Sequence, residues 1–279
     1  MATFRRALWP AAGILSAAAL AWGPLPLCAQ DGTPKLTTEQ KEEFLRTAKI
    51  IADNPANKGV TDTRRVTLTD GKITHDANVQ RIDEHRDYFE GQNGTREFNF
   101  KDTYKFNLAA WELAKLLAIE DMMPPYVERR YAGNPASFSW YVDNELMDDE
   151  ERIAKHLHAP DQAAWREESY VVSVFDQLIY NTDRNEGNLL IDQQWGLWMI
   201  DHTRAFRTRR DLLDPKGLVK CDRNLLARMK ALDADTIHRA LGPYLNKEEV
   251  KGLLARRDKI VKFFEDKGES ALYDRPKRS

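Results

Sequence analysis

The stretch NTDRNEGNLLIDQQWGLWMIDHTRAF, residues 181–206, contains two short apolar runs with acids and amides at their outer ends. The runs at 189–191 and 197–200 are too short for helices, and the polar, glycine-containing segment between them is typical of a hairpin loop. In an antiparallel pair the numbers of facing residues have a constant sum, so a loop centred between positions 194 and 195 places Asn188 opposite Asp201. Facing Cα atoms lie about 4.5–5.5 Å apart. The pattern therefore predicts that an amide and a carboxylate converge at the base of an apolar hairpin.

Amide and carboxylate oxygens together form the kind of hard-oxygen site that Mg²⁺ or Mn²⁺ prefers. Asp183 precedes Asn188 in a polar loop and can face the same space. The alternative is that Asp183 and Asn188 are turn-forming residues and that Asp201 caps the segment after it. The combination favours a site, because groups that are costly to bury without partners stand at both ends of an apolar hairpin.

The spacing Asp183-x-x-x-x-Asn188, followed by the hairpin and by Ile200-Asp201-His202, resembles the catalytic loop and metal-binding Asp of the protein-kinase-like superfamily. The resemblance is to its atypical branch, which includes type II phosphatidylinositol 4-kinases, HipA-type kinases and secretory-pathway kinases. It implies that Asp183 is the catalytic base, that Arg184 orients the catalytic loop, and that Asn188 and Asp201 hold Mg²⁺ or Mn²⁺ together with ATP.

The resemblance is weaker at the nucleotide-binding positions. Such kinases place a phosphate-binding Lys on a strand and pair it with a helix Glu, whereas the aligned positions here carry Gln80 and Asn107. Lys72 can take the role of the Lys only if the alignment is shifted, and the glycine-rich phosphate loop is reduced to Gly59. The sequence therefore predicts an intact metal site beside an altered nucleotide site.

Two functions follow as alternatives. The first is an exported, metal-dependent phosphotransferase that moves a nucleotide phosphoryl group to a hydroxyl of a protein, glycan or lipid. The second is a pseudokinase-type module that binds a nucleotide or a metal with little or no catalysis. Asp183, Asn188 and Asp201 favour the enzyme, and Gln80 and Asn107 favour the binding module.

The hydrophobic pattern before the hairpin predicts a small sheet. Thr37 with Gln40 resembles a capping box for a helix whose apolar face extends to Ile51. Alternating residues on both sides of Asp70-Gly71 predict a strand hairpin, and two further strands are expected near 126–130 and 138–142. Residues 84–103 are polar and are predicted to be a loop.

Helical periodicity predicts the remaining elements. One long helix is expected from Phe106, another over 163–180, and a C-terminal helix after a capping box at Asn246. Together with the resemblance, this order predicts an α+β, two-lobed protein-kinase-like fold. The small sheet and one long helix form an N-lobe over 35–142, and a mainly helical C-lobe covers 143–270. The basic tail, 271–279, is predicted to be disordered after Tyr273.

The N-terminal segment 1–29 is typical of a secretory signal peptide. Arg5 and Arg6 precede an apolar run over 7–22, with a cleavage site expected near Ala29. We therefore expect export to the periplasm or the exterior, with no membrane span left after cleavage. An uncleaved membrane anchor is the alternative.

The charge balance argues against nucleic acid as a partner. The chain of 279 residues has 42 Lys and Arg against 44 Asp and Glu, without the basic excess of a nucleic-acid-binding protein. One local basic cluster, Arg204, Arg207, Arg209 and Arg210, follows the metal-binding Asp. It is either a solvated face or a surface for an anionic substrate.

Overall fold

The computed structural model describes residues 36–55, 63–90, 94 and 96–278, and Leu36–Ser279 forms one compact unit. The predicted signal peptide with its cleavage site, and Gly59, lie outside the described residues. No helix within the described ranges is both long enough and apolar enough to cross a membrane.

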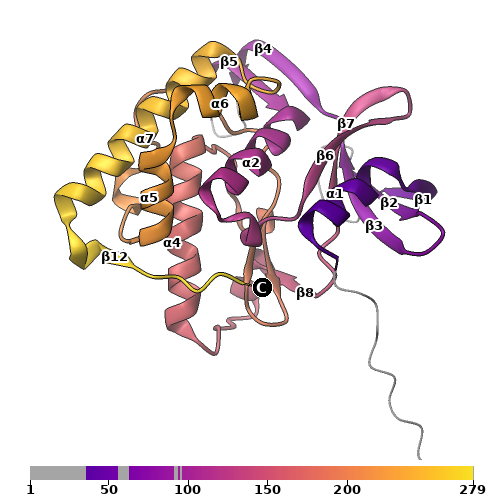
Figure 1. Ribbon diagram of the computed structural model, residues 1–279, viewed down its shortest axis with the longest axis horizontal. Helices are drawn as coiled ribbons and strands as arrows, with labels where there is room; N and C mark the ends of the chain where they lie inside the picture. The colour runs from indigo at the N-terminus through magenta and orange to yellow at the C-terminus, as the bar shows by residue number, and fades with distance from the viewer. Residues whose placement is uncertain (1–35, 56–62, 91–93, 95, 279) are drawn as a thin grey trace, which may run out of the picture. The chain divides into compact units, whose positions relative to one another are not determined.

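A five-stranded antiparallel sheet with strand order β1-β2-β3-β7-β6 forms one part of this unit, and helix α1 packs on β6 and β7 (Figure 1). The predicted hairpin turn is confirmed, because the amide of Asp70 donates to the carbonyl of Ile73 at 3.3 Å and Gly71 has a φ of 89°. Only glycine adopts such a φ without steric cost. The elements are α1 (Thr38–Thr47), β1 (Lys49–Pro55), β2 (Arg64–Thr69), β3 (Thr74–Gln80), β6 (Tyr126–Tyr131) and β7 (Asn134–Trp140).

Helix α1 begins as predicted and ends earlier than predicted. The capping box is present, with the Thr37 amide donating to Gln40 Oε1 at 2.9 Å and the Gln40 amide to Thr37 Oγ1 at 3.3 Å. The chain leaves the helix at Ala48, and Ile51, expected on the helix face, lies in β1. Consecutive β-branched isoleucines favour an extended backbone, and pairing with β2 fixes it.

Glu42 is a buried charge that ties α1 to helix α2 (Tyr104–Leu117). Its carboxylate accepts hydrogen bonds from Trp111 Nε1 at 2.8 Å, Lys115 Nζ at 3.1 Å and Arg46 Nη2 at 2.8 Å. Burial raises the pKa of Glu42, but these three donors outweigh burial and hold the pKa below 4.5.

The Glu42→Gln variant is expected to lose about 1–2 kcal/mol of unfolding free energy near pH 7, because the amide removes the negative charge that pairs with Lys115 and Arg46. A lowered carboxyl pKa stabilises the fold above the unfolded pKa, and this contribution disappears as the pH falls through the folded pKa. The difference between the wild type and the variant should therefore shrink below pH 4.5 and vanish once the pH lies below the folded pKa. Urea unfolding on both sides of that pH measures it, with the exposed Glu43→Gln as control. A loss that is equal on both sides would contradict the assignment.

The loop predicted for 84–103 is wrong, because β4 (Asp83–Glu90) and β5 (Arg96–Thr103) form an antiparallel pair. Most side chains of β4 are exposed on both faces. Such strands carry no alternation of apolar residues, which is the signal by which a half-buried strand is recognised in a sequence.

The predicted helices from Phe106, over 163–180 and after Asn246 are confirmed, and the capping box of Asn246 with Glu249 is present. Helix α2 shares one hydrophobic core with the C-terminal helices, and the sheet has a second core with α1. The division into lobes at residue 142 stays a prediction. The remaining elements are β8 (Glu145–Asp148), α3 (Asp149–Ala154), α4 (Gln162–Ile179), β9 (Leu189–Asp192), β10 (Leu197–Met199), β11 (Cys221–Asp222), α5 (Arg223–Ala231), α6 (Ala234–Leu241), α7 (Lys247–Lys267) and β12 (Leu272–Tyr273).

The tail after Tyr273 is ordered as far as Arg278, so the prediction of a disordered tail is wrong. Arg275 forms two hydrogen bonds with Asp121, at 2.7 and 2.9 Å, and the two side chains are only 4% and 7% exposed. The backbone amide of Arg278 also donates to Asp121, at 3.0 Å. The basic composition of the tail predicted a segment surrounded by solvent. The contacts that order the tail join residues far apart in the sequence, which composition does not reveal.

Candidate active site

The hairpin of β9 and β10 exists as predicted, but its register differs by one residue. Leu190 faces Trp198, and the amide of Ile200 donates to the carbonyl of Asn188 at 3.2 Å, so Asn188 faces Ile200 and not Asp201. The reason is the loop, which has three residues and closes with Trp195 at a φ of 66°. Three-residue hairpin loops commonly end in such a left-handed residue, and their odd length shifts the register relative to a two-residue centre.

Asn188 and Asp201 nevertheless line one cavity of about 580 Å³, together with Asp183 and Gln80. Neither residue belongs to the strand ladder. Asn188 ends a short 3₁₀ turn, and Asp201 follows β10 with a φ of 51°, a left-handed conformation that Asp tolerates better than most residues. The side-chain alternation of the strands therefore does not determine where these two side chains point.

The loop from Asp183 to Asn188 is closed by its own hydrogen bonds. The Asp183 amide donates to Asn181 Oδ1 at 3.1 Å, and Asn188 Nδ2 donates to the Asp183 carbonyl at 3.0 Å. Since the Asn188 nitrogen is used in this way, its amide oxygen is available as a ligand. The Asp183 carboxylate is 40% exposed and lies 3.5 Å from Arg204 Nη1, so a substrate can reach it.

Arg184 does not line the cavity, but its side chain contacts the backbone of residues that do. Its guanidinium binds Asp176 at 2.9 Å and donates to the carbonyl of Ile200 at 2.9 Å and to that of Asn188. It also lies 2.9 Å from His202 Nε2. Burial lowers the pKa of His202, so its ring is neutral and accepts this bond. These contacts give Arg184 a positioning role on both sides of the hairpin.

Gln80 and Asn107 meet beside Asp201 in a chain of hydrogen bonds whose donors are all neutral. Gln80 Nε2 donates to Asp201 Oδ2 at 3.2 Å, Asn107 Nδ2 donates to Gln80 Oε1 at 2.6 Å, and the His202 amide donates to Asn107 Oδ1 at 2.7 Å. Asn107 is fully buried, and only Gln80 reaches the cavity. Lys72 lies instead in the exposed turn between β2 and β3, outside the cavity, so the structure does not bring it to Asp201.

The cavity is strongly acidic. Burial raises the pKa of Asp201, whose hydrogen-bond donors, Gln80 and Thr203, are both neutral. No group of three or more His, Cys, Asp or Glu within the described ranges could hold a metal by itself. A carboxylate and an amide that leave further positions to substrate phosphates fit Mg²⁺, which usually binds through one or two carboxylates. The charged side chains lining the cavity are Arg65, Glu145, Asp148, Glu150, Asp183, Asp201 and Arg204.

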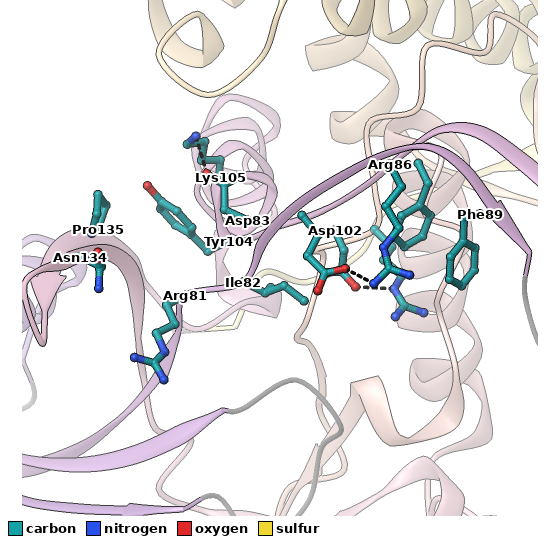
Figure 2. Close-up of a pocket in the computed structure, with 13 residues that line it drawn as sticks. Arg81, Ile82, Asp83, Arg86, Phe89, Asp102, Tyr104, Lys105, Asn134 and Pro135 are labelled. Carbon is teal, nitrogen blue, oxygen red and sulfur yellow. Dashed lines mark hydrogen bonds and ion pairs between the residues drawn. The ribbon is translucent and has the colours of Figure 1, made fainter.

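A second cavity, of about 940 Å³, lies against β4, β5 and the start of α2. In Figure 2 Asn134 and Pro135 lie on one side of it, and Arg86 and Phe89 on the other. Arg204 lines both cavities. The sequence placed this residue in a basic cluster, but in the structure Arg207 is buried and only Arg209 and Arg210 are exposed. Arg65 and Thr203 also line the cavity that contains Asp201, but neither belongs to a sequence motif that would have predicted it.

No protein-family model matches the sequence, and none of the curated proteins matches it. Among solved structures, hydra Fam20 with sugar has a TM-score of 0.59 at 15% identity, covering 85% of this chain and 92% of that chain. The Helicobacter pylori proinflammatory kinase CtkA has a TM-score of 0.48 at 10% identity, covering 77% and 92%. The chain has an atypical protein-kinase-like fold of the α+β class, as predicted.

Proposed function

We propose that the protein is a metal-dependent phosphotransferase that moves the γ-phosphoryl group of a nucleoside triphosphate to a hydroxyl acceptor. The observation that carries the proposal is that Asp183, Asn188 and Asp201 line one cavity, with Gln80 bound to Asp201. The predicted signal peptide supports the further proposal that the enzyme is exported.

The residues divide the reaction between them. Asp183 accepts the proton of the acceptor hydroxyl while the acceptor oxygen bonds to the γ-phosphorus. The bond from the γ-phosphorus to the bridging oxygen breaks, and its electron pair leaves with the nucleoside diphosphate. Asn188 and Asp201 would hold Mg²⁺ or Mn²⁺, which would neutralise the charge of the phosphates.

The charge of the cavity supports dependence on a cation. Five carboxylates and two guanidiniums line it within the described residues, so a polyanionic nucleotide meets a net negative surface. Like charges in such a site repel unless a cation lies between them. The nucleotide is therefore expected to bind as its metal complex.

The alternative function, a pseudokinase-type binding module, is favoured by one observation. Gln80 and Asn107 bond to each other and provide no positive charge for the phosphates. The module would bind the metal–nucleotide complex without turning it over. Both functions predict that the metal–nucleotide complex binds. Only turnover of the nucleotide therefore distinguishes the enzyme from the binding module.

Purified protein is expected to convert ATP to ADP with Mg²⁺ or Mn²⁺ and to stop when a chelator is added. The metal–nucleotide complex should raise the melting temperature by several degrees, since about 2.7 kcal/mol of stabilisation is expected at a concentration of 100 Kd. ATP alone should have little effect. Equal stabilisation with and without metal would contradict the argument from charge. Binding with no turnover under any metal would show the binding module instead.

A further inference from the structure

We propose that Arg204 is a catalytic residue that binds the phosphoryl group in transit, and that Asp102 positions its guanidinium. The inference rests on the proposed function and names the positive charge that Gln80 and Asn107 do not supply. It follows from the place of Arg204 between the two cavities.

Arg204 stands where the two cavities meet, next to the proposed base. Its Nη1 lies 3.5 Å from Asp183 Oδ2, and its Nε donates to Asp102 Oδ2 at 2.7 Å. The backbone carbonyl of Arg204 accepts from the hydroxyl of Thr182 at 2.9 Å, and the backbone beside Asp183 is thereby fixed to it. A donor in the acidic cavity and an acceptor in the second cavity would therefore meet at this guanidinium.

The other cation of the acidic cavity is held elsewhere. Among the described residues lining that cavity, only Arg65 and Arg204 are positively charged. Arg65 Nη2 is bound to Asp76 at 2.6 Å, and its guanidinium lies 3.9 Å from the ring centroid of Tyr141. Arg204 is therefore the cation placed to meet charge that develops beside Asp183.

Asp102 is built to hold Arg204 rather than to react. It is 1% exposed, and one of its carboxylate oxygens is buried without a hydrogen-bond partner, so the guanidinium is its main source of charge compensation. The Arg204 guanidinium also lies 5.6 Å from the ring centroid of Phe100. A cation held by a buried acid and an aromatic ring is already oriented before substrate binds, which is the condition for effective stabilisation of a transition state.

The proposed contact forms during the transfer. When an acceptor hydroxyl reaches Asp183, Arg204 Nη1 meets the non-bridging oxygens of the γ-phosphoryl group. It donates to them while the new bond to the acceptor oxygen forms and the bond to the departing diphosphate breaks. The guanidinium gains and loses no proton in this step.

The test compares Arg204→Gln, Arg204→Lys and Arg210→Gln in the full protein. Arg210 is an exposed arginine of the same segment that lines neither cavity, so its variant removes the same charge as a control. We expect kcat for ATP to fall about 10²–10³-fold in Arg204→Gln, with the Mn²⁺–ATP melting shift retained. Arg204→Lys should recover part of kcat, and a further variant, Arg204→Ala, should be partly rescued by millimolar guanidinium, which a merely structural role would not explain.

Loss of Arg204 leaves Asp102 buried and unpaired, which can unfold the chain. The double variant Asp102→Asn with Arg204→Gln removes both charges and gives the same kcat comparison in a fold without that penalty. Asp102→Asn alone is expected to lower kcat about tenfold at an unchanged KM for Mn²⁺–ATP, as a positioning residue should.

The outcomes are distinct. A wild-type protein without turnover overturns the proposed function, and the inference with it. An active wild type whose Arg204→Gln or double variant stays within about threefold of its kcat overturns only the role of Arg204. Loss of the Mn²⁺–ATP melting shift in a folded Arg204→Gln variant would also overturn the proposed role. That result would mean that Arg204 binds the nucleotide before the transfer and not the phosphoryl group in transit.

Discussion

Asp201→Asn is expected to lower metal-dependent ATP turnover by a factor of about 10²–10³ without unfolding the protein. The substitution keeps the size of the side chain, and its one amide oxygen can accept from either Gln80 or Thr203, but it removes the carboxylate that lies between them. Burial already raises the pKa of Asp201, so a neutral residue at this position should fold as well as the carboxylate or better. Turnover of ATP and thermal unfolding of the same samples measure the two effects.

Asp183→Ala separates the base from the metal ligands. Loss of a general base costs about 10²–10⁴-fold in rate, whereas metal–nucleotide binding does not require it. The melting shift produced by Mn²⁺–ATP should therefore persist in Asp183→Ala and be lost in Asp201→Asn.

Glu186→Gln is the matched control for both variants. Glu186 is an exposed acid of the same loop and does not line the cavity. If Asp201→Asn retains wild-type turnover, or if Glu186→Gln loses as much as Asp183→Ala, the assignment of the site is wrong.

The sequence predicted this site through one short loop and through positions matched to a known fold. Asp183 and Asn188 lie in one short loop, and their convergence needs only that loop to close. Gln80 and Asn107 were matched by position to a strand and a helix, and their side chains do meet beside Asp201. The roles of all these residues stay predictions until the variants are measured.

The parts that were missed depend on contacts between distant segments or on loop details. The register of the hairpin changed because one left-handed residue, Trp195, made the loop odd in length. Strand β4 is almost entirely exposed and has no apolar alternation to reveal its pairing with β5. Arg204 becomes distinct from its basic neighbours through Asp183 and through Asp102, which lies on a strand about a hundred positions away.

Arg275→Ala is expected to lower the free energy of unfolding by about 3–5 kcal/mol, because removal of one partner leaves a buried charge uncompensated. Burial raises the pKa of Asp121, and the two bonds and the charge of Arg275 hold it below the usual value instead. Without Arg275 the Asp121 carboxylate would be buried with the amide of Arg278 as its remaining bond among those the structure shows. The hairpin beside the tail should loosen as a result, since Arg278 contacts Asp192 and the carbonyl of Leu197.

Two further variants make this prediction specific to the buried pair. Lys277→Ala breaks the ion pair between Lys277, which is 48% exposed, and Glu120. It should lower the free energy of unfolding by less than about 1 kcal/mol. The double variant Arg275→Met with Asp121→Leu removes both charges and should recover most of the loss, since well-packed apolar residues often replace a buried ion pair without cost. Urea unfolding of the wild type and the three variants measures the loss in each of them. A loss in Arg275→Ala no larger than in Lys277→Ala would mean that the tail does not hold the fold in solution.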